Sequence, residues 1–433
     1  MHIELAEPQS GARPSHSSGV FIWIAALCAL CQVMDGFDTQ IVGYLAPALA
    51  AAWHISPPQL GPVFSSGLVG MLLGASLLGA SADRFGRRPI IIFATLLFSA
   101  FTLASVLASS PVELMAFRFG AGIGLGAVIP NTMALVGEFA PAEKRVTVMM
   151  LTSCGFVFGA TVGGFISAVM LPRWGWQSPL YVGGLVPLVI ALFMCFKLPE
   201  STLFLRGKSQ AAETAETVVT LQSAYTPKKR FHTLAALFIK ERRTGTLVIW
   251  SLFFLNMLTL FLTSSWLSTA FHISRYSAFE ATTFATAFQL GGVIGTIGFA
   301  MLIRRYSFSR VLPFMLLVGA STTALLGHAI VQKEFALVAC LTIVGGICVV
   351  GGQCVINALG AHYYPTAIRA TGMGIALSVG RCGSIIGPLI GGQLLKLSIP
   401  IDLVFIYVSG FLYLGCLLIF IFRKEIVPSY VEN

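Results

Sequence analysis

The sequence contains few charged residues. Lys, Arg, Asp and Glu make up 10% of its 433 residues, whereas hydrophobic residues make up 56%, and the mean hydropathy is +0.85. This composition excludes a soluble globular protein. Apolar stretches of about 18 residues or more, long enough to cross a bilayer, recur along the chain. We predict twelve transmembrane helices, at residues 20–48, 59–81, 89–109, 112–136, 146–171, 177–197, 244–271, 279–303, 311–331, 334–361, 371–396 and 401–422.

The sequence also lacks the residue patterns of enzymes and metal sites. No cluster of His, Cys and Asp and no nucleophile constellation points to catalysis, so we expect neither an enzyme nor a cofactor. The nine cysteines lie mostly in apolar segments, where cysteine is typically a packing residue. We therefore expect no disulfide and no metal site. The predicted loops are short and leave little room for a docking domain, which argues against a scaffold protein.

One long hydrophilic stretch divides the predicted helices six and six. We therefore predict an all-α membrane protein of two six-helix bundles. The predicted parts are an N-terminal tail (1–19), an N-terminal bundle (20–198), a linker (199–243), a C-terminal bundle (244–422) and a C-terminal tail (423–433). The first tail is polar and lacks the basic start of a secretory signal peptide, so we interpret it as cytoplasmic.

The two halves are related by an internal repeat. At an offset of 224 residues, Phe139–Arg145 falls on Tyr363–Arg369, and each segment has Pro at its third and Arg at its seventh position. Several glycines that follow also coincide. This ordered match indicates a parallel duplication, with the halves related by an axis along the membrane normal.

Basic residues are unevenly distributed between the two sides of the membrane. If both termini are cytoplasmic, the outer loops hold only Arg173, Arg275, Lys333 and Lys396 of the 27 Lys and Arg residues. Cytoplasmic loops of membrane proteins carry such an excess. We therefore expect a multi-pass inner-membrane protein with both termini in the cytoplasm. A basic cytoplasmic face that lies on anionic lipid explains the net charge of +10, so no nucleic-acid partner is needed.

Two carboxylates lie inside the first apolar segment, in Asp35-Gly36-Phe37-Asp38. A carboxylate at membrane depth costs roughly 2.5–3.5 kcal/mol on insertion scales. Residues three apart lie on nearly the same face of a helix. A chain that keeps such a pair is expected to use it for binding, for ion pairing or for carrying protons.

Arg118 and Arg381 are the two basic residues that we place within the bilayer, away from the ends of the predicted helices. At about 1.5 Å per residue, Arg381 lies near the midplane, while Arg118 lies at a depth similar to that of Asp38. We hypothesise that Arg381 binds a carboxylate of the substrate. Asp35 and Asp38 then carry protons or form a switchable pair with Arg118. The alternatives are that Arg118 and one aspartate form a permanent structural ion pair, and that Arg381 only packs between helices.

Other polar and aromatic residues at membrane depth are candidates for the same site. Each buried polar group needs a partner there, so some of these residues could simply bond between helices, and any one aromatic could be a core or lipid-facing residue. Besides Arg381 and Arg118, the candidate binding residues are Phe37, Gln40, Tyr44, Asn131, Asn256, Gln289, Gln353 and Asn357.

The loop between the second and third helices reads Gly79-Ala-Ser-Ala-Asp83-Arg84-Phe85-Gly86-Arg87-Arg88-Pro89. It resembles the signature loop of the major facilitator superfamily, which implies a gating role for Asp83, Arg84, Gly86 and Arg87. The alternative is a charge cluster that only sets topology. The corresponding loop of the second half lacks the Asp and the Gly.

Further inner-side residues are expected to take part in gating. Glu138, at the inner end of the fourth helix, is expected to anchor a salt bridge, for instance to Arg145, rather than to bind substrate. Arg369 is the repeat counterpart of Arg145.

Four short motifs resemble those of the aromatic acid:H+ symporters of that superfamily. They are Asp35-Gly-Phe-Asp38, Arg118-Phe-Gly-Ala-Gly122, Leu198-Pro199-Glu200-Ser201 and Gly380-Arg381-Cys382-Gly383. The resemblance implies proton-driven uptake of benzoate-like or hydroxybenzoate-like carboxylates by alternating access. We expect a monomer whose partners are the aromatic carboxylate, protons and the lipid bilayer. Alternative functions of the same fold are a drug or metabolite/H+ antiporter and a sugar porter, although export of cations would not need Arg381.

Overall fold

The structure is a computed structural model that describes residues 18–141, 144–201, 204–205, 237–239 and 242–426. Within these residues it is helical and contains no strand. Twelve spans among them have the length and apolar composition to cross a membrane, which confirms the twelve predicted spans. The predicted tails and linker lie largely outside the described residues.

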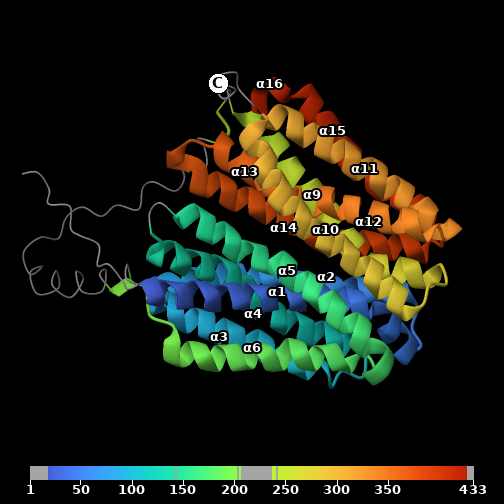
Figure 1. The fold of residues 1–433 in the computed structure, drawn as a ribbon, viewed down its shortest axis with the longest axis horizontal. Coiled ribbons are helices and arrows are strands. Elements are labelled where there is room, and N and C mark those ends of the chain that lie inside the picture. The colour runs from blue at the N-terminus through green and yellow to red at the C-terminus, as the bar shows by residue number, and fades with distance from the viewer. Residues whose placement is uncertain (1–17, 142–143, 202–203, 206–236, 240–241, 427–433) are drawn as a thin grey trace, which may run out of the picture.

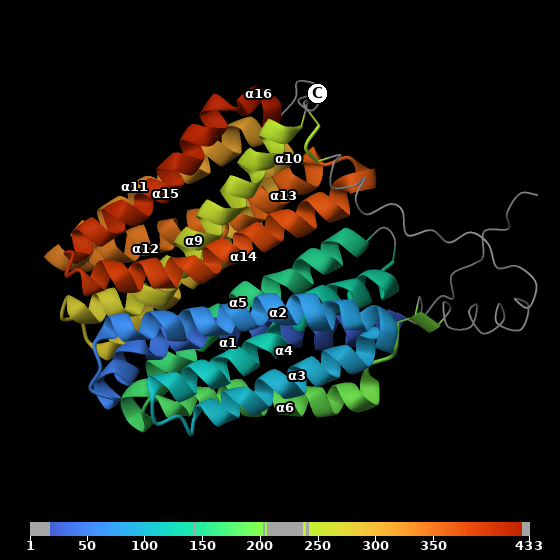
Figure 2. The ribbon, with the colours of Figure 1, turned by 180° about the vertical axis from the view of Figure 1, so that it is seen from behind.

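The helices form two bundles (Figures 1 and 2). The N-terminal bundle consists of α1 (Ser18–Ala52), α2 (Gly61–Phe85), α3 (Arg87–Ser105), α4 (Pro111–Phe139), α5 (Arg145–Trp174) and α6 (Gln177–Lys197), with the short 3-10 helix η1 (Pro57–Leu60) before α2. The C-terminal bundle consists of α9 (Arg243–Ile273), α10 (Ala278–Arg305), α11 (Phe308–Gln332), α12 (Phe335–Val349), α13 (Gln353–Tyr363), α14 (Thr366–Lys396), α15 (Ile401–Ile421) and α16 (Arg423–Ile426).

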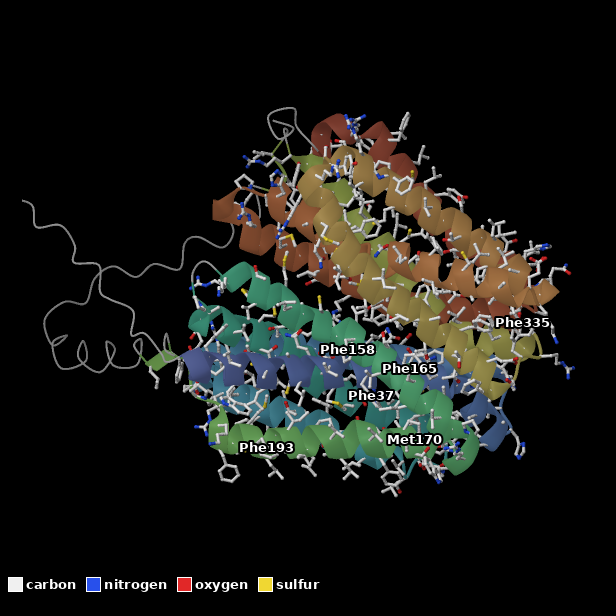
Figure 3. All side chains as sticks on the ribbon, viewed as in Figure 1. Phe37, Phe158, Phe165, Met170, Phe193 and Phe335 are labelled. Carbon is white, nitrogen blue, oxygen red and sulfur yellow. The ribbon has the colours of Figure 1, made fainter. Side chains whose placement is uncertain are left out.

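Both bundles are apolar on the outside as well as in the core, as helices in lipid are. Phe193 of α6 is 60% exposed and points outward, whereas Phe37 of α1 is buried inside the N-terminal bundle (Figure 3). Cys28 and Cys31 have the spacing of a CxxC motif, but both are buried and free. The Cys31 thiol contacts the Thr95 hydroxyl at 3.4 Å, so these cysteines pack between helices.

The two bundles meet through α1 with α9, α2 with α14, and α5 with α10. We call the end of the molecule that holds Lys197 and Arg243 the linker end, and the other end the opposite end. The Ser65 hydroxyl of α2 donates to the Ile385 carbonyl of α14 at 2.7 Å in the half nearer the opposite end. A side chain in place of Gly43 on α1 would press against Ser264 of α9. The ribbons of the two bundles diverge toward the linker end (Figure 1).

The predicted helix at 334–361 is two helices, α12 and α13, joined by a turn at residues 350–352. The turn contains two glycines and no proline, so only a weak signal in the sequence indicates the break. The Gln353 N–H donates to the Val350 carbonyl at 3.3 Å, which leaves the Val349 carbonyl without its helical donor. Asn256 of α9 donates its side-chain Nδ2 to that carbonyl at 3.2 Å. A neighbouring helix thus satisfies the freed backbone group, as membrane depth requires.

Candidate functional site

Asp35 and Asp38 are both fully buried on α1. The residues between them fix how α1 packs. A Cβ at Gly36 would collide with the Phe156 backbone of α5, so glycine allows the close approach of these two helices. The ring of Phe37 lies against Gly163 of α5 and Gly183 of α6. Phe37, a predicted ring-stacking residue, therefore lies inside the N-terminal bundle.

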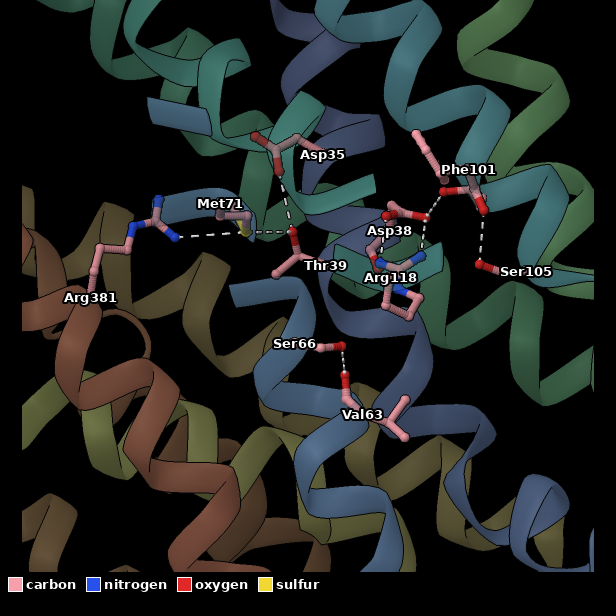
Figure 4. A network of polar contacts seen from close by, with 11 residues as sticks. Asp35, Asp38, Thr39, Val63, Ser66, Met71, Phe101, Ser105, Arg118 and Arg381 are labelled. Atoms are coloured by element: carbon pink, nitrogen blue, oxygen red, sulfur yellow. Dashed lines mark hydrogen bonds and ion pairs between the residues drawn. The ribbon is translucent and has the colours of Figure 1, made fainter. Parts of the chain in front are cut away.

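Asp38 has a complete set of partners (Figure 4). Arg118 of α4 binds its carboxylate through two hydrogen bonds, Nη2 to Oδ2 at 2.6 Å and Nη1 to Oδ1 at 3.1 Å. Arg118 Nη2 also donates to the Asp38 backbone carbonyl at 3.0 Å, and the Thr102 hydroxyl of α3 donates to Oδ1 at 2.7 Å. Such a fork of charge-assisted bonds fixes both side chains. The depth argument from the sequence correctly paired Arg118 with Asp38.

Asp35 is much less satisfied. Its Oδ1 accepts a hydrogen bond from the Thr39 hydroxyl one turn along α1, at 3.2 Å. Its Oδ2 is buried and has no hydrogen-bond partner among the described residues. In Figure 4 this oxygen carries no dashed line and points away from Thr39. Burial of an unpaired charged oxygen is expensive. A donor to this oxygen, or the loss of its charge, would remove that cost.

Arg381 of α14 faces Asp35 across the interface between the bundles. Its Nη1 contacts the Met71 sulfur of α2 at 3.8 Å, and the Thr39 hydroxyl reaches the same sulfur at 3.8 Å. Arg381, Met71, Thr39 and Asp35 therefore lie in a row (Figure 4). The ion pairs found among the described residues do not include Arg381. It is a partly buried cation next to a neutral thioether, within the electrostatic reach of Asp35.

A cavity of about 20 Å³ lies between the bundles beside this row. Thr39, Gln40, Met71 and Arg118 line it from the N-terminal bundle, and α9 closes it. A volume of this size holds little more than a water molecule. An organic ligand would need the bundles to separate here.

The remaining candidate residues fall into two groups. Asn256, Gln353 and Asn357 form an amide chain in the C-terminal bundle, in which Asn256 Nδ2 donates to Gln353 Oε1 at 2.8 Å and Gln353 Nε2 donates to Asn357 Oδ1 at 3.0 Å. The structure does not bring the others into that chain. Gln289 donates to the Ser264 hydroxyl at 3.2 Å, Tyr44 donates to the Ala160 carbonyl at 2.9 Å, and Asn131 donates to the Ala127 carbonyl of its own helix at 2.8 Å.

Three of the predicted gating residues, Gly86, Arg87 and Glu138, lie in a compact cluster at the linker end. Glu138 pairs with Arg87, so the suggested partner Arg145 was wrong, and Arg145 Nε is buried without a hydrogen bond among the described residues. The Ser201 hydroxyl donates to Glu138 Oε2 at 2.6 Å. The α2–α3 loop is thereby joined to the ends of α4 and α6.

Glu200 completes this cluster. Its Oε1 accepts from the backbone N–H groups of Arg87 at 2.9 Å and Arg88 at 3.1 Å, which are unpaired donors at the start of α3. Gly86 has φ +97°, and a Cβ there would collide with the Glu200 carboxylate. Glycine is therefore required at position 86 twice over.

Three other gating candidates lie apart from these contacts. Arg369 Nε donates to the Tyr364 carbonyl at 3.1 Å. The Arg84 guanidinium lies 5.4 Å from the centre of the Phe85 ring. The side chain of Asp83 lies outside the described part of the structure.

A family model matches most of the chain. The model of the Major Facilitator Superfamily matches the chain in two overlapping segments, residues 28–366 and 249–432. The chain belongs to the Major Facilitator Superfamily. This confirms the predicted fold and makes the protein a transporter rather than an enzyme.

Relatives within the superfamily cover most of this chain. It is 36% identical over 387 residues to the 4-hydroxybenzoate transporter PcaK of Pseudomonas aeruginosa, with 86% of each chain covered. It is 35% identical over 393 residues to a gallate transporter of Pseudomonas putida, with 88% of this chain and 87% of the relative covered. The solved structure of a D-xylose-proton symporter superposes with a TM-score of 0.75 at 18% identity, covering 95% of this chain and 99% of the other.

In this superfamily member, the sequence analysis did not identify several residues of the Asp35–Arg381 row and of the cluster around Glu138 at the linker end. Glu200 and Ser201 stood in a segment recognised only as a resemblance, since nothing in the sequence brings the end of α6 to the α2–α3 loop. Thr39 carried a signal, because it lies one turn after Asp35. Met71 and Thr102 carried none, because each is one of many similar residues in an apolar helix.

Proposed function

We propose that this superfamily member takes up an aromatic carboxylic acid together with protons across the inner membrane. The observation that carries the proposal is Arg381, a guanidinium whose neighbour across the bundle interface is a thioether and not a carboxylate. Arginine stays charged and can hold a carboxylate through two parallel hydrogen bonds. The names of the aromatic-acid relatives support an aromatic ring on that carboxylate.

Asp35 couples the proton to the substrate in this proposal. A nearby cation favours the charged form of an aspartate, and burial favours the neutral form. An anion bound to Arg381 offsets that cation and so strengthens proton binding at Asp35, whose electrostatic partner is Arg381. By linkage, a proton on Asp35 strengthens anion binding equally. Substrate and proton would therefore enter as a pair.

The other residues have supporting roles in the proposal. Asp38 and Arg118 keep α1, α3 and α4 in register and stay paired. The amide chain of Asn256, Gln353 and Asn357 offers donors and acceptors to ring substituents. The cluster of Arg87, Glu138 and Glu200 holds the linker end of the N-terminal bundle together while the bundles move.

We further propose that the linker end faces the cytoplasm and that the protein works as a monomer. The distribution of Lys and Arg supports this orientation. The Ser65–Ile385 hydrogen bond joins the bundles in the half nearer the opposite end, and their ribbons diverge toward the linker end (Figure 1).

Uptake by purified protein in liposomes tests the proposal. A panel of labelled benzoate, 4-hydroxybenzoate, gallate and xylose is offered with and without an imposed pH gradient. We expect concentrative uptake of one or more aromatic acids only with the gradient, and none of xylose. Aromatic-acid uptake that ignores the gradient would contradict proton coupling, and uptake of the sugar alone would contradict the substrate class.

Variants of Arg381 test the binding residue. Arg381→Ala should abolish binding of the aromatic acid, and Arg381→Lys should retain part of it, because the charge remains while the two-pronged geometry is lost. Arg173→Ala, at an exposed arginine at the end of α5, is the matched control and should bind normally. Unchanged affinity in Arg381→Ala would refute the assignment.

A further inference from the structure

Two buried oxygen atoms without partners lie one turn apart on α1. They are Asp35 Oδ2 and Gln32 Oε1, and neither has a hydrogen bond among the described residues. Both residues are 0% exposed. Side chains three residues apart on a helix are neighbours. Two unpaired acceptors at membrane depth carry a heavy desolvation cost, so a donor between them is expected.

The orientation of the Gln32 amide is determined by its neighbours. The Thr132 hydroxyl of α4 has the Val128 carbonyl at 2.8 Å and the Ile129 carbonyl at 3.1 Å as acceptors for its hydrogen, and its oxygen is left to accept. Gln32 Nε2 is 2.9 Å from that oxygen. The nitrogen of the amide therefore faces Thr132, and the free atom is the carbonyl oxygen, a pure acceptor.

Asp35 Oδ2 is also an acceptor as long as the carboxyl group is ionised. The Thr39 hydroxyl donates to the other oxygen, Oδ1, and gives Oδ2 nothing. A carboxylic acid, in contrast, carries one O–H donor. A single proton on Oδ2 is the smallest change that supplies a donor for the Gln32 oxygen and removes the buried charge.

We propose that Asp35 is protonated in this conformation and that its Oδ2–H donates to Gln32 Oε1, which makes Gln32 a positioning residue of the proton site. One proton from water adds to the carboxylate, and no other bond forms or breaks. This inference rests on the proposed function, in which Asp35 carries the coupled proton. It adds the residue that holds the proton in place on Asp35.

Several charged or titratable groups surround Asp35. Arg381 of α14 and Asp38 on α1 act on it electrostatically, and the neighbouring Cys31 is a buried thiol. Arg118 of α4 forms its ion pair with Asp38. The thiol of Cys154 on α5 interacts with Cys354. Gln32 supplies the one neutral interaction in this set that acts only on the protonated acid. Without it, Arg381 should expel the proton more readily.

Infrared difference spectroscopy of the full chain in lipid vesicles tests this directly. A pH titration should reveal the C=O stretch of one buried carboxylic acid, and this band should be absent in Asp35→Asn. In Gln32→Met, which keeps the size but removes the acceptor, the band should move to the frequency of a less strongly bonded acid. Its titration midpoint should fall by about one pH unit, a tenfold loss of proton affinity, because one hydrogen bond to the acid is removed.

Two further variants keep the test decisive. Thr132→Val leaves Gln32 in place but removes the oxygen that orients its amide, so the band should shift in the same direction by less. Ser167→Ala removes another buried hydroxyl without a partner, on α5, and should leave the band unchanged.

The outcomes separate this inference from the proposed function. A band that titrates identically in wild type, Gln32→Met and Thr132→Val, or no Asp35 band at any pH, would overturn the role of Gln32. If the band shifts as expected but uptake ignores the pH gradient, the proton site stands and proton-coupled uptake fails.

Discussion

Asp35 and Asp38 lie on one helix, three residues apart, and both are fully buried, yet their surroundings differ completely. Asp38 receives three hydrogen bonds on its carboxylate from Arg118 and Thr102. Asp35 receives one, from Thr39. Membrane depth penalises both equally, so depth alone does not determine the role of a carboxylate. The hydrogen-bond partners determine it. Of the two acids, only Asp35 has a carboxylate oxygen without a hydrogen-bond partner among the described residues.

The location of the partners explains the difference. Arg118 and Thr102 belong to the same bundle as Asp38, so the pair can remain intact when the bundles move. Arg381, the cation that acts on Asp35, belongs to the other bundle. In the proposed function, Asp38 is therefore part of the framework of its bundle, and Asp35 responds to what lies between the bundles.

The largest effect is expected from Arg118→Ala. This variant leaves Asp38 as an uncompensated buried charge, and breaking a buried pair in this way costs about 3–5 kcal/mol. We expect a large fall in thermal stability in detergent and loss of transport. The double variant Asp38→Asn/Arg118→Gln should recover part of the stability. A stable Arg118→Ala protein would mean that the pair is dispensable to the fold.

A second variant would give Arg381 a carboxylate partner within the protein, as Arg118 has in Asp38. Met71→Glu places a carboxylate beside the Arg381 guanidinium, which should then be neutralised and unavailable to an anion. We expect a folded protein whose affinity for the aromatic acid falls by about a hundredfold, equal to the loss of a charge-assisted contact of about 2.7 kcal/mol. Met71→Gln, of the same shape without the charge, is the control. Normal binding by Met71→Glu would place the substrate away from Arg381.

Asp35→Asn should separate stability from coupling. The change removes a carboxyl group with one hydrogen bond, so we expect the thermal stability to stay near that of wild type. Accumulation driven by a pH gradient of one unit should fall by about tenfold, because one coupled proton is lost, while exchange of labelled for unlabelled substrate should continue. A marked loss of stability would instead assign Asp35 to the framework together with Asp38.

The smallest expected effects come from the two threonines. Thr102→Val removes a donor to a charged carboxylate and should cost about 1.5 kcal/mol, near the upper limit for such bonds in membranes, whereas Thr39→Val should cost about 0.6 kcal/mol. The measurement is the free energy of unfolding of each variant in detergent, compared between the two variants. Equal costs would indicate that Asp35 and Asp38 carry the same charge in the folded protein.

The sequence predicted features that depend on position along a helix. Depth and spacing correctly placed the twelve spans and the partner of Asp38. They failed where a contact depends on how loops and helix ends come together, as with Glu138, whose partner is Arg87 and not Arg145. They also failed at the α12–α13 turn, because a break without proline depends on a donor from another helix, Asn256. Side-chain direction was equally hidden, so the sequence left open whether Phe37 binds substrate or packs in the core, and the structure shows it in the core.

The row from Arg381 through Met71 and Thr39 to Asp35 crosses the boundary between two moving bodies. The Coulomb energy between two charges varies inversely with their separation and with the local dielectric constant. Any sliding or tilting of one bundle against the other therefore changes the electric field at Asp35, even with no ligand present. In the proposed function, the row would act as a displacement sensor. The relative position of the two bundles would set the proton affinity of Asp35, so proton binding and release would follow the opening and closing of the molecule.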